Sequence, residues 1–137
     1  MNSLFAGIWN HFSATTGSGF YNDVSGRMYL GHAPQESTFP YCVYFSVSDF
    51  DELDFTDERE DFLIQFNVFS ENNSATQAGT LLESLKTMFD NCSLTVTNWR
   101  HLKFQRSLVV PNNDLTQQPP IHGYSIEYDV LLEKARS

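Results

Sequence analysis

YCVYFSVSDFDELDFTDEREDFLIQFNVFS, residues 41–70, contains two alternating segments with a run of acidic residues between them. In the first segment Tyr41, Val43, Phe45 and Val47 alternate with Cys42, Tyr44, Ser46 and Ser48. In the second, Phe62, Ile64, Phe66 and Val68 alternate with Leu63, Gln65, Asn67 and Phe69. A period of two is typical of a strand whose side chains point to two distinct faces. The stretch therefore predicts an antiparallel hairpin.

The connection between these strands holds eight of the chain's seventeen acidic residues: Asp49, Asp51, Glu52, Asp54, Asp57, Glu58, Glu60 and Asp61. Three interpretations compete: a metal site, a disordered acidic segment, and a charged turn that faces a partner. An EF-hand register starting at Asp49 places Leu53 at the fifth position and Asp54 where a glycine is required. Apolar residues also interrupt the charges, which a disordered tract does not need. We favour a solvated hairpin tip that faces partners, with adventitious divalent-ion binding as the second interpretation.

The elements on either side of the hairpin complete an α+β pattern. Apolar residues at three- and four-residue spacing predict helices over residues 3–14 and 74–90, the second with a capping box of Ser74 and Gln77. Strands are expected at 27–31, 94–99, 101–110 and 123–134. The order is helix, three strands, helix, then two or more strands, in one domain spanning residues 1–137. So few helices must cover one face of a mainly antiparallel sheet.

Composition restricts the function classes. The chain has 137 residues with a net charge of −9, which argues against nonspecific binding to nucleic-acid backbones. No apolar run reaches the roughly 18 residues that cross a bilayer, and the N-terminus lacks a secretory signal, so we expect synthesis in a reducing cytoplasm and free thiols. The four histidines show no metal-ligand spacing, and no nucleotide-binding or nucleophile motif occurs. We expect no enzyme activity, no metal and no cofactor.

Three segments together carry a family resemblance: GRMYLGHAPQESTFPYCVYFSVSD, FLIQFNVFSENNSATQAGTLLESLKTMFDN and GYSIEYDVLLEK. They resemble the small tail completion, or tail terminator, proteins of long-tailed bacteriophages and gene transfer agents, over nearly the whole chain. The positions that match the family pattern near its first strands are Gly26, Arg27, Tyr29, Pro34, Pro40 and Tyr41. The chain departs from the pattern at Leu30 and Gly31, and at the hairpin tip, where relatives tend to carry glycines.

The resemblance implies a structural role. Subunits of such proteins close into a ring, typically a hexamer, on the head-proximal end of the tail tube. The ring ends polymerisation of the tube protein and offers a surface to the head completion or connector protein. It implies a location in the virion tail after assembly in the host cytoplasm, with DNA passing through without specific binding. Three alternatives remain open: another head-tail connector component, a tail tube subunit, and a stand-alone α+β domain that binds a ligand or regulates an enzyme.

Arg100, Lys103 and Arg106 form the main basic cluster. In an unbroken strand Arg100 and Arg106 share one face and Lys103 points to the other. One interpretation is a solvated strand with cross-strand partners such as Glu127 and Asp129. The other is that the cluster meets the acidic hairpin of an adjacent subunit, where opposite charges fix the register.

Overall fold

The computed structural model describes residues 2–14, 19–53, 58–72 and 74–134, with side chains described for all of these except Asn2, residues 48–53 and Glu58. Within these residues the elements follow in the order α1 (Asn2–Ser13), α2 (Gly19–Asp23), β1 (Met28–Leu30), β2 (Tyr41–Leu53), β3 (Glu58–Glu71), α3 (Thr76–Phe89), β4 (Trp99–Pro111) and β5 (Ile121–Lys134). The predicted α+β class is confirmed.

The strands form one sheet in the order β1-β2-β3-β5-β4. The pairs β2–β3, β3–β5 and β4–β5 are antiparallel, so the predicted hairpin of β2 and β3 is present. The sheet is mainly antiparallel, as predicted, and the exception is the first strand, since β1 pairs with β2 in parallel over three residues. The sheet is therefore mixed, with β1 and β4 at its two edges.

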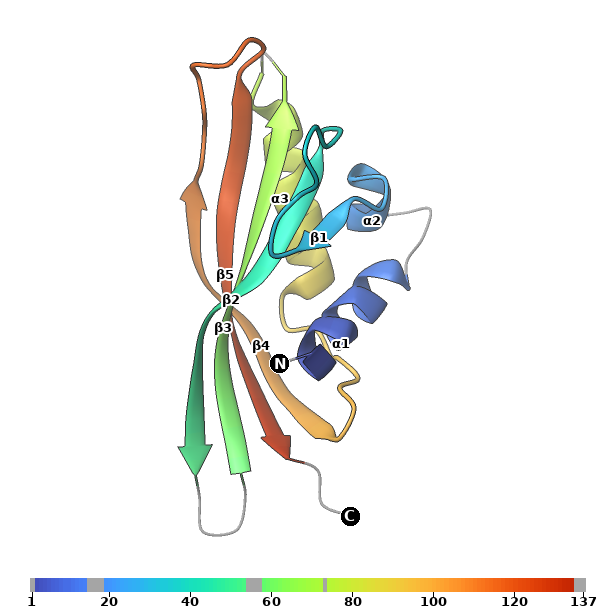
Figure 1. The fold of residues 1–137 in the computed structure, drawn as a ribbon, viewed down its shortest axis with the longest axis vertical. Coiled ribbons are helices and arrows are strands. Elements are labelled where there is room, and N and C mark those ends of the chain that lie inside the picture. The colour runs from blue at the N-terminus through green and yellow to red at the C-terminus, as the bar shows by residue number, and fades with distance from the viewer. Residues whose placement is uncertain (1, 15–18, 54–57, 73, 135–137) are drawn as a thin grey trace.

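All three helices lie on the same side of the strongly twisted sheet (Figure 1). Alternation places one face of each long strand against them: Phe62, Ile64, Phe66 and Val68 of β3 and Ile126, Tyr128, Val130 and Leu132 of β5 are buried. The apolar stripe of α3 covers this face, with Leu81, Leu85 and Phe89 buried. The other face of the sheet carries no helix among the described residues.

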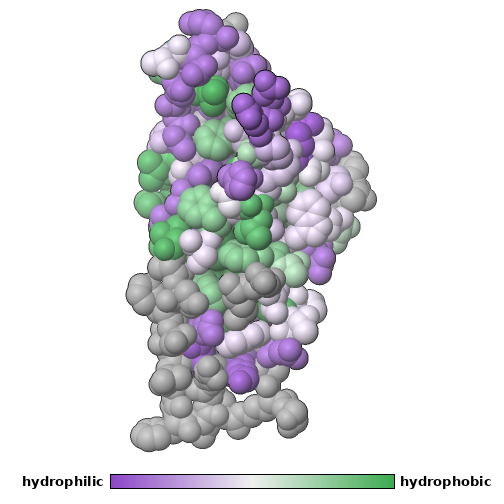
Figure 2. Space-filling model, viewed as in Figure 1, coloured by the Kyte–Doolittle hydropathy of each residue, from purple (hydrophilic) through white to green (hydrophobic). Residues whose placement is uncertain are grey.

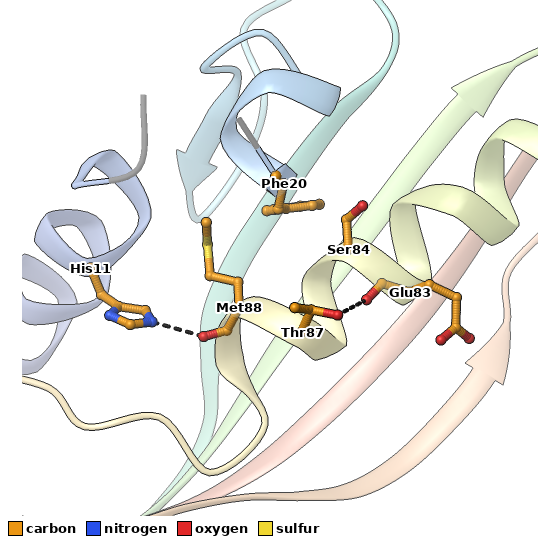
Figure 3. Close-up of a pocket in the computed structure, with 7 residues that line it drawn as sticks. His11, Phe20, Glu83, Ser84, Thr87 and Met88 are labelled. Carbon is orange, nitrogen blue, oxygen red and sulfur yellow. Dashed lines mark hydrogen bonds between the residues drawn. The ribbon is translucent and has the colours of Figure 1, made fainter. Parts of the chain in front are cut away.

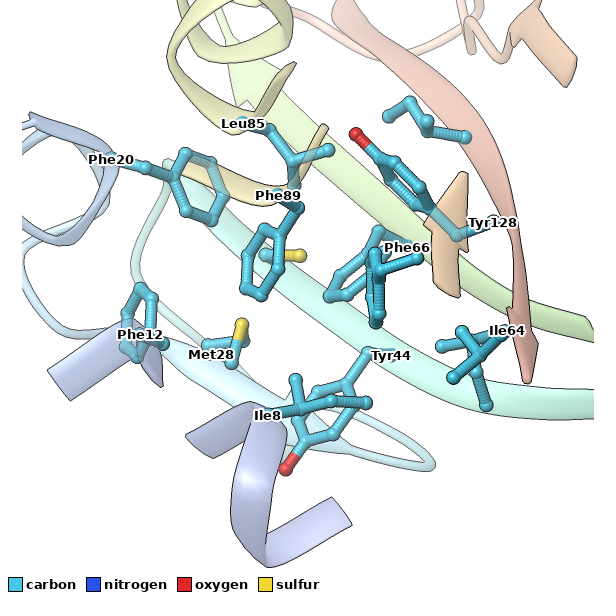
Figure 4. Packing of buried hydrophobic residues seen from close by; sticks show 14 of the residues in the cluster. Ile8, Phe12, Phe20, Met28, Tyr44, Ile64, Phe66, Leu85, Phe89 and Tyr128 are labelled. Carbon is cyan, nitrogen blue, oxygen red and sulfur yellow. The ribbon is translucent and has the colours of Figure 1, made fainter. Parts of the chain in front are cut away.

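The centre of the core is aromatic (Figure 4). The Phe66 ring lies 4.7 Å from Phe89 and meets Tyr128 edge-on at 5.7 Å, between α3 and the sheet. The ring of Phe104 in β4 lies 4.8 Å from that of Tyr128, with the two planes tilted by 40°. Offset and edge-on aromatic pairs add to the stabilisation from buried area. Part of the aromatic content, which is 15% of the chain, thus lies in the core.

The strand expected at residues 94–99 is absent before Trp99, where Val96 and Trp99 form only an isolated bridge. Two further local expectations were wrong. The predicted capping box is absent: Ala75 occupies the N-cap of α3, and Gln77 instead accepts a hydrogen bond from Ser70 Oγ of β3. Ser74 Oγ accepts a hydrogen bond from the Thr76 backbone N–H at 3.2 Å. Ser74 therefore caps the helix through the residue two positions after it, and not three positions after it as in a capping box. The second difference is α2, a five-residue helix that the sequence pattern did not predict and that buries Phe20.

Candidate assembly surfaces

The acidic segment is part of the β2–β3 ladder. The strands pair from Tyr41↔Phe69 to Leu53↔Glu58, so Asp51 lies opposite Glu60 and Glu52 lies opposite Arg59. Asp49, Asp51 and Glu52 belong to β2, and Glu58, Glu60 and Asp61 belong to β3, whereas Asp54 and Asp57 lie outside the described residues. In Figure 1 these strand ends reach past α1, away from the helices. The negative charge is therefore carried along two paired strands and is not confined to a turn.

A buried carboxylate joins three strands near the outer end of this hairpin. Glu133 of β5 is 6% exposed and accepts a hydrogen bond from Arg59 Nε of β3 at 3.2 Å. Its other oxygen accepts from Arg100 of β4. The register places Arg59 and Arg100 directly opposite Glu133 on its two sides. Because two guanidinium groups neutralise one carboxylate, the charge of Glu133 is satisfied despite its burial.

A second charged group lies on the same sheet face, nearer the middle. Lys103 Nζ donates to Asp129 Oδ2 at 3.0 Å. A hydrogen bond from the Asp61 carboxyl group, followed by Lys103, lowers the pKa of Asp129 against the opposing effect of partial burial. Together with the Glu133 group, these residues form a charged network over β3, β5 and β4 on the face that no described helix covers.

The basic cluster is arranged differently from the prediction for an unbroken strand. The β4–β5 register shifts between His101 and Lys103, which brings Arg100 and Lys103 onto the same face. Arg106 lies on the opposite, helix-covered face, where it contacts Asp90 at 3.5 Å. Lys103–Asp129 is one of the predicted cross-strand pairs. A bulge is the physical reason, since one extra residue inverts the alternation that follows.

The same irregularities expose apolar residues of β4. In an unbroken strand Leu102, Phe104, Leu108 and Val110 would share one face, but Phe104 is buried while the other three are exposed. A second register shift, between Arg106 and Leu108, separates Phe104 from the last two. Figure 2 shows hydrophobic side chains gathered at mid-height of one face, with hydrophilic ones at the upper end. The surface is thus more apolar than the alternation predicts.

Arg27 fixes the loop that precedes β2. Its Nε donates to the Pro40 carbonyl at 3.0 Å and its Nη2 to the Phe39 carbonyl at 3.2 Å, while its own carbonyl accepts from the Cys42 N–H. Gly26 before it has a φ of +73°, a conformation that favours glycine. These members of the family pattern are therefore close in space and hold β1 against β2.

A group of aromatic rings lies beside the Arg27 contacts and extends across the sheet. Tyr41 lies 6.2 Å from Tyr29, 5.1 Å from Phe39 and 5.4 Å from Phe69. Phe39 and Phe69 were not predicted as partners, and the only sequence signal for them is that Phe69 alternates with the core residues of β3. Pro34 is separate from the group, and its carbonyl accepts from Ser37 Oγ at 2.6 Å. The group is a platform of half-buried rings on the helix-free face.

A pocket of about 480 Å³ lies between the helices (Figure 3). It is lined by His11, Phe20, Glu83, Ser84, Thr87 and Met88, among others. His11 Nε2 bonds the Met88 carbonyl at 2.8 Å and Ser84 donates to Asp23, so the polar groups here have structural partners. The Ser84 hydroxyl is bonded to a carboxylate and not to a histidine, so the described lining residues contain no Ser–His pair.

Other reactive groups are dispersed. Burial raises the pKa of the Cys92 thiol to about 12 and raises that of Cys42 further, so neither is an activated thiolate. The Nε2 atoms of His101 and His122 are buried without a hydrogen-bond partner, and burial lowers the pKa of His101. Within the described ranges, no three His, Cys, Asp or Glu side chains are grouped to hold a metal ion. None of the helices in this part of the chain has the length and apolar character to cross a bilayer.

Comparison with known proteins gives a match of fold. No protein-family model matches the sequence, and no curated protein matches it. A chain in the structure of the virion of a native gene transfer agent (GTA) particle is similar, with a TM-score of 0.77 and 11% sequence identity. The alignment covers 93% of this chain and 92% of that chain. The two chains therefore share a fold over nearly their whole lengths.

Proposed function

We propose that this protein is a structural virion component that forms a ring on the head-proximal end of a phage-type tail tube. The observation that carries the proposal is the nearly full-length likeness to a chain of a gene transfer agent virion. The resemblance of the Gly26-Arg27, Pro40-Tyr41 and β5 segments to tail terminator proteins gives the specific role. The ring ends tube polymerisation and presents a surface to the head completion protein.

The architecture supports ring formation. A closed ring requires heterologous contacts, in which one patch of a subunit meets a different patch of the next. The helices occupy one face of the sheet, which leaves the opposite face and both sheet edges available. A hexamer is the stoichiometry we propose from the family resemblance.

The acidic hairpin has two possible placements in such a ring. Some of its carboxylates line the channel or its rim, where like charge keeps DNA from sticking, or they dock on a basic surface of a partner. In both placements the hairpin acts by charge and binds no DNA specifically. The net charge of −9 is consistent with both.

The test is negative-stain imaging of the purified protein, alone and mixed with tail tubes of the virus that encodes it, in near-physiological salt. Closed rings of uniform diameter, or density on one end of the tubes, are the expected result. Filaments that grow without limit would instead indicate a tail tube subunit. Free monomers that ignore the tubes would overturn the proposal in favour of a stand-alone domain.

A further inference from the structure

We propose that the ring closes through antiparallel pairing of β4 of one subunit with the free part of β2 in a second copy of this chain. The inference rests on the proposed ring and names the two edges that join. It predicts one continuous sheet around the ring, with the helices of every copy on the same side of it.

Both edges are long and lack a neighbouring strand. β4 has 13 residues and pairs only with β5 among the strands described. On the other side of the sheet β1 pairs with β2 only at Cys42 to Tyr44, so from Phe45 to Leu53 the one strand beside β2 in the described part of the chain is β3. Long unpaired edges bind another strand readily through their free N–H and C=O groups.

The exposed apolar residues concentrate on these same edges. Three large hydrophobic side chains on the two edges joined in this register are between 40% and 48% exposed: Val47 of β2, and Leu102 and Leu108 of β4. Edge strands of soluble proteins are ordinarily protected by charges, prolines or bulges, and both of these edges also carry charged residues. Pairing with another chain would bury the exposed apolar side chains that lie between those charges.

Charge alternates along one row of the sheet. The register aligns Glu52 of β2, Arg59 of β3, Glu133 of β5 and Arg100 of β4 in sequence across the sheet. The signs along the row are negative, positive, negative and positive. When a second copy is placed level beside β4, its Glu52 follows Arg100 and continues the alternation. Residues of opposite charge that face each other across two strands stabilise the pair. The same residues disfavour other registers, in which like charges would face each other.

The strand directions agree with this arrangement. Because β2–β3, β3–β5 and β5–β4 are each antiparallel, β2 and β4 run in opposite directions within one subunit. Copies related by rotation about a ring axis keep these directions, so β4 meets the next β2 antiparallel. The two edges differ from each other, and the contact is therefore heterologous and can close a ring.

The test uses Ser48→Cys together with Gln105→Cys. Ser48, Leu63, Asp129 and Gln105 form one row, so within a subunit the two ends are separated by two intervening strands, roughly 14 Å from β2 to β4. Between level copies they are neighbours. A bismaleimide linker with a reach of about two strand spacings should give a ladder of covalent oligomers ending at the ring size. Each single variant is the control and should give at most dimers.

A second variant tests the apolar edge without cross-linking. Leu108→Lys should abolish rings while leaving the circular dichroism spectrum unchanged, because the side chain is exposed on the monomer. Leu115→Lys is the matched control, since Leu115 is 62% exposed but lies between β4 and β5, off the edge. Rings that form normally without cross-links, and that tolerate Leu108→Lys, would overturn this inference and leave the proposed function standing. Absence of both rings and tube caps in the native protein would overturn the two together.

Discussion

Tyr128 in the middle of β5 donates its phenolic O–H to Asp90 Oδ1 at 2.6 Å, which joins the sheet to the residue that ends α3. Burial, and then the bond to Asp90, raise the pKa of Tyr128 above its usual range. Arg106 contacts the other oxygen of Asp90, so β4, β5 and the end of α3 meet at one carboxylate. This contact orients the helix over the core and carries the first prediction.

Tyr128→Phe should lower the free energy of unfolding by about 1–3 kcal/mol, because the hydrogen bond to a charged acceptor is lost while the ring packing stays. Tyr124→Phe is the control: the same strand loses a hydroxyl that has no hydrogen-bond partner among the described residues. Urea unfolding of both variants measures the difference. Equal effects from the two would contradict a stabilising role for the Asp90 contact.

Glu133→Gln should destabilise the protein by about 1–3 kcal/mol, since Arg59 and Arg100 would lose the carboxylate that neutralises them. Glu83→Gln removes an exposed ion pair with Lys86 and should cost less than about 0.5 kcal/mol. Chemical denaturation compares the two variants at neutral pH. If Glu133→Gln lowered the free energy of unfolding no more than Glu83→Gln does, the ion pairs of Glu133 would not stabilise the protein.

Acid should remove the contribution of Asp129 to the free energy of unfolding. Because its folded-state pKa lies below the ordinary 3.8, the unfolded chain binds more protons in the acid range and stability rises with pH there. The contribution is fully present above about pH 4 and is lost as the pH falls through the lowered folded pKa. The stability difference between the native protein and Asp129→Asn should therefore be constant from pH 5 to 7 and shrink below pH 4. A difference that persists to pH 2 in urea titrations would contradict the assignment.

Two glycines give opposite predictions. A Cβ at Gly123 would overlap the Val68 carbonyl oxygen and lie 2.9 Å from that of Asn112, so Gly123→Ala should cost roughly 1–3 kcal/mol. A Cβ at Gly79 in α3 would meet nothing, and Gly79→Ala should gain roughly 0.5–1 kcal/mol from helix propensity. Thermal unfolding of the pair checks both signs. Stabilisation by Gly123→Ala would contradict the close approach of the three strands.

The long elements could be predicted because their patterns are local. Alternation in β3 and β5 repeats over at least eight residues and the apolar stripe of α3 runs from Ala78 to Phe89, and the structure buries the expected faces. The short α2 has one buried residue, Phe20, too few for a helical period to be visible. The parallel pairing of β1 is likewise set by Arg27 and the loop before β2, and three residues carry no signal of direction.

The arrangement of the charged residues could not be predicted in full. The shift between His101 and Lys103 inverts the faces of β4, and nothing in the residue types marks the extra residue. Glu133 was not singled out, because its burial depends on Arg59 and Arg100, which are far from it in the sequence. Lys103–Asp129 was anticipated because both strands were correctly predicted as neighbours in the sheet. Long-range register, more than local propensity, limits what the sequence yields here.

Neutralising the hairpin tests its role in assembly. Replacing Asp51, Glu52, Asp54, Asp57 and Glu58 with Asn or Gln should impair tail joining or DNA passage while leaving the fold intact, because the role proposed for the hairpin depends on its charge. The control replaces Glu36, Glu71 and Glu83 with Gln, which lowers the net negative charge at exposed positions elsewhere. Infectivity of virions complemented with each variant is the readout, with circular dichroism as the check on folding. Full infectivity of the hairpin variant would exclude a charge-based role, whereas equal loss in both variants would assign the effect to net charge and not to the hairpin.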